Sequence, residues 1–226
     1  MKKISFGRRI EIKRDQNPFI SQSELAYQVL LDSIISGDIE IGEKLNQEEL
    51  SKQLDMSRTP VRDALIRLSN EKIISKGDNN GSYIHKIDIK DYMEFCEFRI
   101  IIEETAAYYA ARSILDSQLE ELKNILDRYV EACNKHNGDL AWDLDDRFHS
   151  LIIQASRNSY IINAYDNISI KRKIYISYMK SIDDLQCAKK KHIAIYNAIN
   201  SADENLAKDS MYSHLSWYNR GIIKFN

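Results

Sequence analysis

The chain has 226 residues, a formal net charge of -2 and 43 % apolar residues. This length allows two small domains or one large one, with enough apolar side chains for a core. Only two prolines and seven glycines occur, so we expect long helices and few strands. The near-neutral charge excludes a globally basic nucleic-acid binder, and any DNA contact must use locally concentrated positive charge.

The cysteine count and the hydropathy pattern exclude further classes. Three widely spaced cysteines argue against a disulfide framework and a zinc ribbon, and indicate reduced thiols. The N-terminus carries charge with no apolar run after it, unlike a signal peptide. No segment approaches the roughly 20 apolar residues of a membrane span. We therefore expect a cytoplasmic protein without a membrane partner.

Residues 1–19 are predicted to form a flexible basic arm that ends at Asn17-Pro18. The arm's first fourteen residues hold a single acid, Glu11, against the bases Lys2, Lys3, Arg8, Arg9, Lys13 and Arg14. A second basic excess lies at 52–76. Both could meet phosphate, although such runs can equally be solvated surfaces, which is the reading we favour for the arm alone.

Residues 20–87 carry the pattern of a winged helix-turn-helix. Ser21 and Glu24 form a capping box before the first helix, and Asn46 starts a short second helix that ends near Leu54. A third helix begins at Ser57 after only two or three residues. A short helix, a tight turn and a longer helix are typical of this DNA-binding motif.

The segment after these helices predicts a wing. Residues 73–76 and 82–86 suit two paired strands, and 77–81 between them has strong turn chemistry. An irregular loop is the alternative.

The start of the third helix contains candidate DNA-reading side chains. Arg58 and Arg62 are four residues apart and share one helix face, where arginine can contact guanine bidentately. Ser57 and Thr59 offer hydroxyl groups to phosphate near a helix N-terminus. The alternative is an ordinary surface helix with two solvated arginines.

This region resembles the winged helix-turn-helix of the GntR family of regulators. The resemblance rests on residues 35–37, 41–45, 49–51 and 57–65, the last containing Ser57-Arg58-Thr59-Pro60-Val61-Arg62, and on Gly81 as the wing glycine. It implies binding to a pseudo-palindromic operator DNA as a homodimer.

Two positions depart from that family. Lys72 stands where the family usually has a glycine, and the wing tip 78–80 lacks a basic residue. These departures put DNA contacts by the wing in doubt, and compensation by the basic arm is a hypothesis.

Residues 88–226 read as a helical bundle. Helical periodicity covers 89–112, 116–135, 139–156, 158–180, 184–200 and 202–224. The predicted fold class is therefore mostly α, with an N-terminal winged helix-turn-helix and a C-terminal all-helical domain for effector binding and dimerisation.

Four polar residues of this bundle suit a divalent metal. Asp145 and His149 share a helix face, while His192 and His214 lie eleven residues before and after Asp203, the presumed turn of a helical hairpin. Both imidazoles then lie about 16 Å from that turn, at the same height. Three histidines and one carboxylate make a plausible metal site, and ordinary core or surface histidines are the alternative.

The same region resembles the FCD effector domain found in the FadR-type branch of the GntR family. The resemblance rests on 98–99, 103–104, 106–107, 145–149 and 155–158, and on His192, 198–199, Met211 and His214. It implies a bound metal, zinc first and nickel or manganese as alternatives, held by Asp145, His149, His192 and His214. A small carboxylate metabolite would bind beside it.

Four residues are candidates for that effector: Arg99, Asn158, Arg172 and Tyr175. Arg99 matches the family's arginine at the start of the first effector helix, and arginine grips carboxylates bidentately. Its alternative role is a helix-end salt bridge with Glu103.

The predicted function is a ligand-responsive, DNA-binding transcriptional regulator, either a repressor or an activator, and not an enzyme. A metal-dependent hydrolase or lyase with a DNA-binding appendage is the second hypothesis, because such ligands can activate water. A helical interaction protein without metal is the third.

Overall fold

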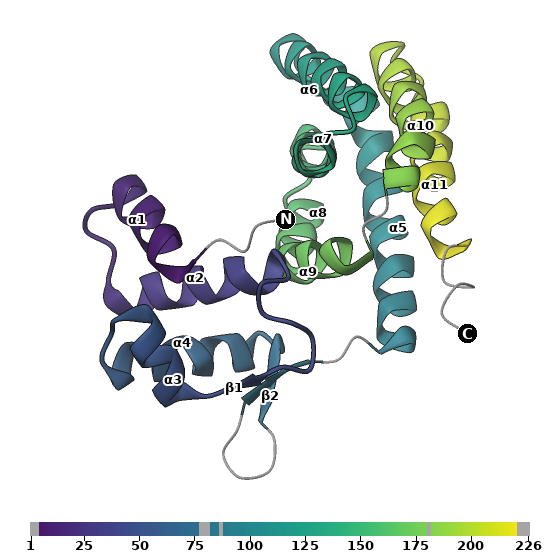
Figure 1. Ribbon diagram of the computed structural model, residues 1–226. Helices are drawn as coiled ribbons and strands as arrows, with labels where there is room; N and C mark the ends of the chain where they lie inside the picture. Colours follow the sequence, from purple (N-terminus) through teal and green to yellow (C-terminus); the bar gives the residue numbers. More distant parts are fainter. Residues whose placement is uncertain (1–4, 77–81, 86–87, 180–181, 221–226) are drawn as a thin grey trace. The chain divides into compact units, whose positions relative to one another are not determined.

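The computed structural model describes residues 5–76, 82–85, 88–179 and 182–220 (Figure 1). The chain divides into two compact units. Unit 1 comprises Met1–Asp88 and Lys171–Met179, and unit 2 comprises Ile89–Ile170 and Lys180–Asn226. Among the described residues, no helix combines the length and the apolarity needed to cross a bilayer.

The predicted flexible arm is wrong, because Phe6–Gln16 form helix α1. Arg9 is buried, and its guanidinium pairs with the carboxylate of Asp38. Lys13 Nζ lies 2.8 Å from Asp32 Oδ2. Two cations that were expected to be solvated are therefore paired within the fold and hold α1 against the rest of unit 1. A count of charges cannot show which charges are already paired within the fold.

Three helices form the centre of unit 1: α2 (Gln22–Ile35), α3 (Gln47–Leu54) and α4 (Arg58–Asn70). The N-cap side chains predicted for the first two each accept from backbone N–H groups, Ser21 from Glu24 and Asn46 from Glu48 and Glu49. Their apolar faces pack into a core that includes Leu25, Leu30, Ile34, Leu54, Val61 and Leu68.

The predicted wing strands are present. β2 (Ile74–Lys76) pairs antiparallel with β3 (Ser82–Ile84), and β1 (Lys44–Leu45) pairs with the other edge of β3. The sheet order is therefore β1-β3-β2. The turn at 77–81, with the wing glycine Gly81, lies outside the described residues.

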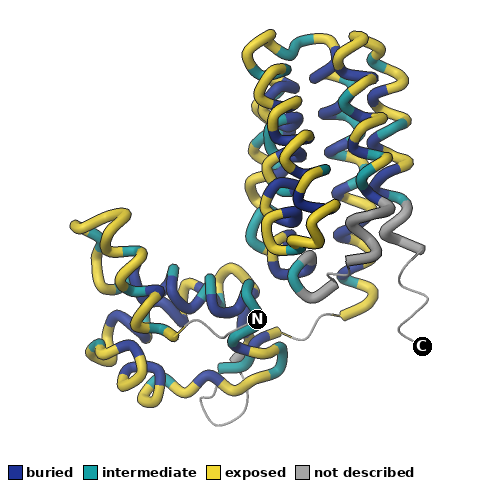
Figure 2. The backbone as a smooth tube through the Cα atoms, turned by 45° about the horizontal axis from the view of Figure 1, so that its top comes forward, coloured by how far each residue is buried: buried dark blue, intermediate teal, exposed yellow. Residues whose placement is uncertain are grey.

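Unit 2 is helical throughout its described residues. Its helices are α5 (Ile89–Ser113), α6 (Asp116–Asn134), α7 (Gly138–Ala155), α8 (Ser159–Asn167), α10 (Ile182–Asn200) and α11 (Glu204–Arg220). α5 packs along α11 and α7, and α10 packs along α11 and α6. Figure 2 shows buried and exposed positions alternating along the coloured parts of the helical bundle, as amphipathic packing requires.

The single helix predicted over 158–180 is wrong. α8 ends at Asn167, Ile168 caps it, and a separate helix, α9, runs over Ser169–Met179. From Lys171 onward α9 belongs to unit 1. Both helices have apolar residues in helical spacing, so periodicity alone does not reveal the break between them.

Several helices end on a left-handed residue that is not glycine. In the described part of the chain these residues are Asp55, Lys72, His136, Arg157 and Ala202. Lys72 has φ 58°, and the flanking N–H groups of Lys72 and Ile73 bond to the carbonyls of Ser69 and Leu68. This is the Schellman motif, in which glycine is the preferred residue. The geometry explains why a glycine is usual at this position.

Candidate metal centre and DNA-reading helix

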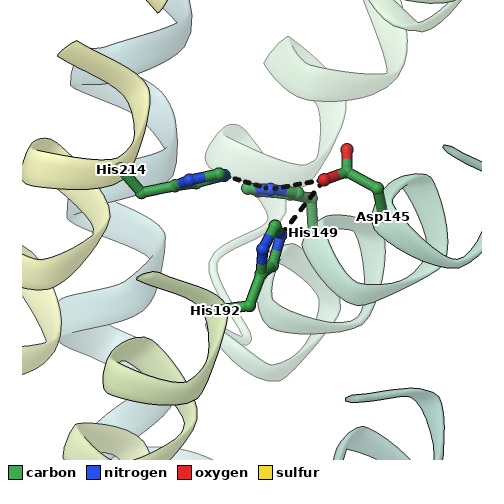
Figure 3. Close-up of side chains that lie close together, drawn as sticks. All are labelled: Asp145, His149, His192 and His214. Carbon is green, nitrogen blue, oxygen red and sulfur yellow. Dashed lines mark hydrogen bonds and ion pairs between the residues drawn. The ribbon is translucent and has the colours of Figure 1, made fainter. Parts of the chain in front are cut away.

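The four residues predicted to bind metal come together inside unit 2 (Figure 3). Asp145 and His149 lie one turn apart on α7, His192 lies on α10 and His214 on α11. Each is at most 2 % exposed. One ligand atom from each residue can be chosen so that all four atoms lie within 4.8 Å of one another.

The α10–α11 hairpin places two of these histidines at the same height. α10 ends at Asn200 and α11 begins at Glu204, so the turn is where the sequence predicted it. The rings of His192 and His214 have their centroids 4.4 Å apart. This proximity confirms the prediction that the two imidazoles lie at the same height, which rested on their equal distances from the turn.

His192 has one ring nitrogen fixed by the backbone. Its Nδ1 lies 3.0 Å from the carbonyl oxygen of Ala188, which can only accept, so Nδ1 donates. In a neutral ring Nε2 then carries a lone pair, and it lies 3.1 Å from Oδ1 of Asp145. Neither of these atoms has a hydrogen-bond partner, although both are buried. Two buried acceptors that face each other are costly unless a proton or a metal cation lies between them.

His149 also has its Nδ1 next to an oxygen acceptor, in this case a carboxylate. Its Nδ1 lies 2.5 Å from Oε2 of Glu103 on α5. Its Nε2 lies 3.0 Å from Nε2 of His214 and 4.0 Å from Oδ1 of Asp145. The sequence analysis named Glu103 only as a partner of Arg99. No local pattern indicated its contact with His149, which lies 46 positions away in the chain.

Electrostatic effects and burial keep Asp145 and His214 in the protonation states that bind a metal. Burial alone would raise the pKa of Asp145, but His192, His149 and Arg99 outweigh it and hold that pKa below its ordinary value. Burial, together with neighbouring positive groups, lowers the pKa of His214 well below its ordinary value. The cluster therefore favours a carboxylate beside a neutral imidazole, which are the protonation states of metal ligands.

The donor set fits a divalent transition metal. Atoms bound to one zinc ion about 2 Å away lie roughly 3–3.5 Å from each other. The contacts of 3.0 and 3.1 Å within the cluster are close to that spacing. Three imidazole nitrogens and one carboxylate oxygen suit zinc, and nickel or manganese also accept such ligands.

The predicted effector residues do not all lie at this cluster. Arg99 is buried on α5, and its Nε donates to Oε1 of Glu103 at 2.5 Å. The salt bridge that was its alternative role is therefore present, in the interior instead of at an exposed helix end. Asn158 caps α8, accepting from the N–H groups of Tyr160 and Ile161. Arg172 and Tyr175 are buried on α9, in unit 1.

The other candidate site is the first turn of α4 in unit 1. Asp55 adopts a left-handed conformation after α3, and α4 starts three residues later. Ser57, Arg58 and Thr59 are exposed, as is Arg62 one turn on. The Ser57 side chain makes no capping hydrogen bond, and the first turn contains no acid. Its hydroxyl and the helix N-terminus are thus suited to phosphate.

The cations of this turn have only loose intramolecular partners. Arg58 Nη2 lies 3.4 Å from Glu48 Oε1, and Arg62 Nη2 lies 3.5 Å from Asp63 Oδ1. Both arginine side chains are more than half exposed, at 70 % and 59 %. Exposed pairs of this kind contribute roughly 0–1 kcal/mol, so a phosphate or a base can displace them.

Comparisons with known proteins cover both the region of the DNA-reading helix and the region of the metal cluster. Residues 22–84 match the family described as bacterial regulatory proteins, gntR family, and residues 94–216 match the FCD domain. The chain is 27 % identical to the HTH-type transcriptional repressor RspR of Escherichia coli, over 90 % of each protein. It is 25 % identical to the gluconate operon transcriptional repressor of Bacillus licheniformis, over 80 % of this chain and 76 % of that one.

Solved structures share the fold. Escherichia coli McbR/YncC superposes with a TM-score of 0.75 at 19 % identity, covering 92 % of this chain and 100 % of the other. A GntR regulator from Rhodococcus gives the same TM-score and identity, covering 91 % and 99 %. The named relatives regulate transcription, which confirms the prediction of a regulator and gives no support to an enzyme. The chain belongs to the GntR family of bacterial regulatory proteins, and it is a DNA-binding transcriptional regulator with an FCD effector domain.

Proposed function

We propose that this regulator binds a pseudo-palindromic operator as a homodimer and senses a small organic acid at a divalent metal ion held by its FCD domain. The observation that carries the proposal is the buried cluster of Asp145, His149, His192 and His214. Its carboxylate oxygen and imidazole nitrogens converge in the interior, with contacts of 3.0 Å (His149 Nε2 to His214 Nε2) and 3.1 Å (His192 Nε2 to Asp145 Oδ1), and one divalent ion would satisfy them together. Zinc is the first candidate.

The state of the neighbouring carboxylate favours a sensor over a hydrolase. Both need an open position on the metal, but a hydrolase also needs a general base within reach of the substrate. Here Glu103, which contacts the cluster at His149, is 0 % exposed and engaged with both Arg99 and His149. Such a site suits binding more than turnover.

The proposed effector is a small carboxylate. A divalent ion attracts one carboxylate, and Arg99 grips another with its terminal nitrogens while its Nε stays on Glu103. A relative is named for the gluconate operon, and gluconate is a carboxylate. Asn158 stays in the proposal as a further lining residue, although it already has a capping role. Arg172 and Tyr175 belong to unit 1, and we assign them no contact with the effector.

For DNA, we assign base readout to Arg58 and Arg62 and phosphate contacts to Ser57 and Thr59. Each good bidentate arginine–guanine pair contributes about 1–3 kcal/mol of discrimination. Pairing of two chains would set the spacing of two such helices on one face of the duplex. Because two of the relatives compared above are named repressors, repression in the cytoplasm is the regulatory mode we propose.

One binding experiment tests the effector part of the proposal. Purified protein would be analysed for metal, stripped with a chelator and reloaded with zinc, then screened by thermal shift against a panel of mono- and dicarboxylic acids. We expect about one metal per chain and a stabilising acid only in the metal-loaded protein. Absence of metal, with the same acid response in stripped and loaded protein, would remove the metal from the function.

The DNA part has a separate test. Light scattering gives the mass of the protein in solution, and fluorescence anisotropy gives its affinity for operator DNA selected from random sequence. We expect a dimer, a pseudo-palindromic site and an affinity that the stabilising acid changes. A monomer bound to a single asymmetric half-site contradicts the proposal.

A further inference from the structure

A buried chain of three side chains runs from α5 to the metal cluster. Arg99 Nε lies 2.5 Å from Oε1 of Glu103, and Oε2 of Glu103 lies 2.5 Å from Nδ1 of His149. The three residues are 8 %, 0 % and 0 % exposed. We call them the Arg99–Glu103–His149 relay. None of the sequence patterns assigned a role to Glu103 at the metal.

The relay fixes where protons can lie. Each carboxylate oxygen of Glu103 faces a different neighbour, and a carboxylate can only accept. A buried carboxylate is stable only when it is paired, so the Arg99 guanidinium compensates its charge from one side. His149 must then donate from Nδ1, and its Nε2, which lies 3.0 Å from Nε2 of His214, is left with a lone pair.

We propose that Glu103 is a positioning residue that sets the tautomer and the ring orientation of His149 for a divalent cation, and that Arg99 holds Glu103 in place. The role in cation binding rests on the metal site proposed above. The assignment of the tautomer does not, because it follows from the contacts of Glu103 with Arg99 and His149. Carboxylate–histidine–metal relays of this type also raise the basicity of the ligating nitrogen.

His192 and His149 each donate a hydrogen bond from Nδ1, but their acceptors differ in charge. His192 donates to a neutral carbonyl, that of Ala188, whereas His149 donates to a charged carboxylate. The charged partner polarises the imidazole more strongly, so Nε2 of His149 should be a stronger metal ligand than Nε2 of His192. Loss of Glu103 should therefore weaken the metal site even when all four ligands remain.

The proposed substitution is Glu103→Gln, which keeps the shape of the side chain. An amide can accept from His149 through its oxygen, but it then presents its N–H group to the Arg99 donor. We expect the affinity for cobalt(II), measured by chelator competition and by its visible absorption, to fall 10- to 100-fold. Glu103→Ala, which removes both contacts, should lose more than Glu103→Gln.

Glu104→Gln is the matched control. Glu104 is the next residue on α5, its side chain is 19 % exposed, and it lies 3.7 Å from Lys208 instead of the cluster. Its cobalt affinity and spectrum should equal those of the unchanged protein. A generally loosened helix would lower the affinity of both variants, so the difference between them isolates the relay.

Nitrogen-15 NMR of metal-free protein with labelled histidine reads the tautomer directly and needs no variant. We expect a protonated Nδ1 and an unprotonated Nε2 on His149, with this preference lost in Glu103→Gln. A protonated Nε2 in the unchanged protein, or an unchanged cobalt affinity in a folded Glu103→Gln, overturns the inference. If the unchanged protein binds no cobalt or zinc, the proposed metal function fails, while the NMR result still decides the tautomer.

Discussion

His149 Nε2 and His214 Nε2 lie 3.0 Å apart in space although their residues are 65 positions apart in the chain. The two rings are stacked, with an interplanar angle of 19°. This contact joins α7 to α11, and both nitrogens also face the carboxylate of Asp145 or the ring of His192. A bound ion would therefore connect three helices through four short bonds.

The first prediction concerns metal-dependent stability. At a free zinc concentration 100 times the dissociation constant, the unchanged protein should gain about 2.7 kcal/mol in the free energy of unfolding. His214→Ala removes one ligand and should lose most of that gain. Urea unfolding with and without zinc measures the difference. His85→Ala, at an exposed histidine of unit 1, is the control and should keep the full gain.

The second prediction concerns DNA reading. Arg58→Ala and Arg62→Ala should each weaken operator binding by about 1–3 kcal/mol, because each removes a bidentate base contact. Binding to unrelated DNA should weaken much less. Anisotropy titrations with both DNAs give the two affinities. An equal loss on both DNAs would show that these arginines contact only phosphate.

The third prediction concerns the end of α4. Lys72→Gly should stabilise the protein by about 0.5–1 kcal/mol, because glycine adopts φ 58° without the strain of a side chain. Asn70→Gly, within the last turn of the right-handed helix, should destabilise it by a similar amount. Thermal unfolding of both variants tests the pair, and destabilisation by Lys72→Gly would contradict the strain argument.

The fourth prediction concerns a junction between α2 and α4. The Arg67 guanidinium carbon lies 3.6 Å from the centre of the Tyr27 ring, and Arg67 Nη1 donates to Glu24 at 2.6 Å. Tyr27 Oη donates to Glu71 at 2.7 Å, and the environment of Tyr27, burial first and then Glu71, raises the pKa of its hydroxyl. These contacts close a ring of side chains around the end of α4.

Arg67→Ala should therefore cost about 1–2 kcal/mol in the free energy of unfolding, since it loses a cation–π contact as well as exposed ion pairs. Tyr27→Phe should cost about 1 kcal/mol through the lost hydrogen bond alone. Chemical denaturation measures both. Arg67→Lys keeps the charge but not the planar stacking, so full stability in that variant would show that stacking contributes nothing.

Sequence patterns predicted much of this architecture for identifiable reasons. Capping residues and apolar periodicity located α2, α3 and α4 because these signals are local. The proximity of His192 and His214 was also predictable, since a helical hairpin with equal arms brings them together. Their meeting with Asp145 and His149 was expected from the resemblance to the FCD domain. Residues that act through distant partners were not predictable. The burial of Arg9 against Asp38 and the contact of Glu103 with His149 depend on packing that no local pattern encodes.

The proposed metal site would also have a kinetic consequence. Asp145 and His149 precede α8 and α9, whereas His192 and His214 follow them, so a bound ion cross-links the chain across a closed loop that contains both helices. Like a disulfide, such a cross-link restricts the unfolded chain as well as joining the folded one. The α7–α10–α11 bundle could then open fully only after the ion leaves, and the dissociation rate of the metal would limit its unfolding.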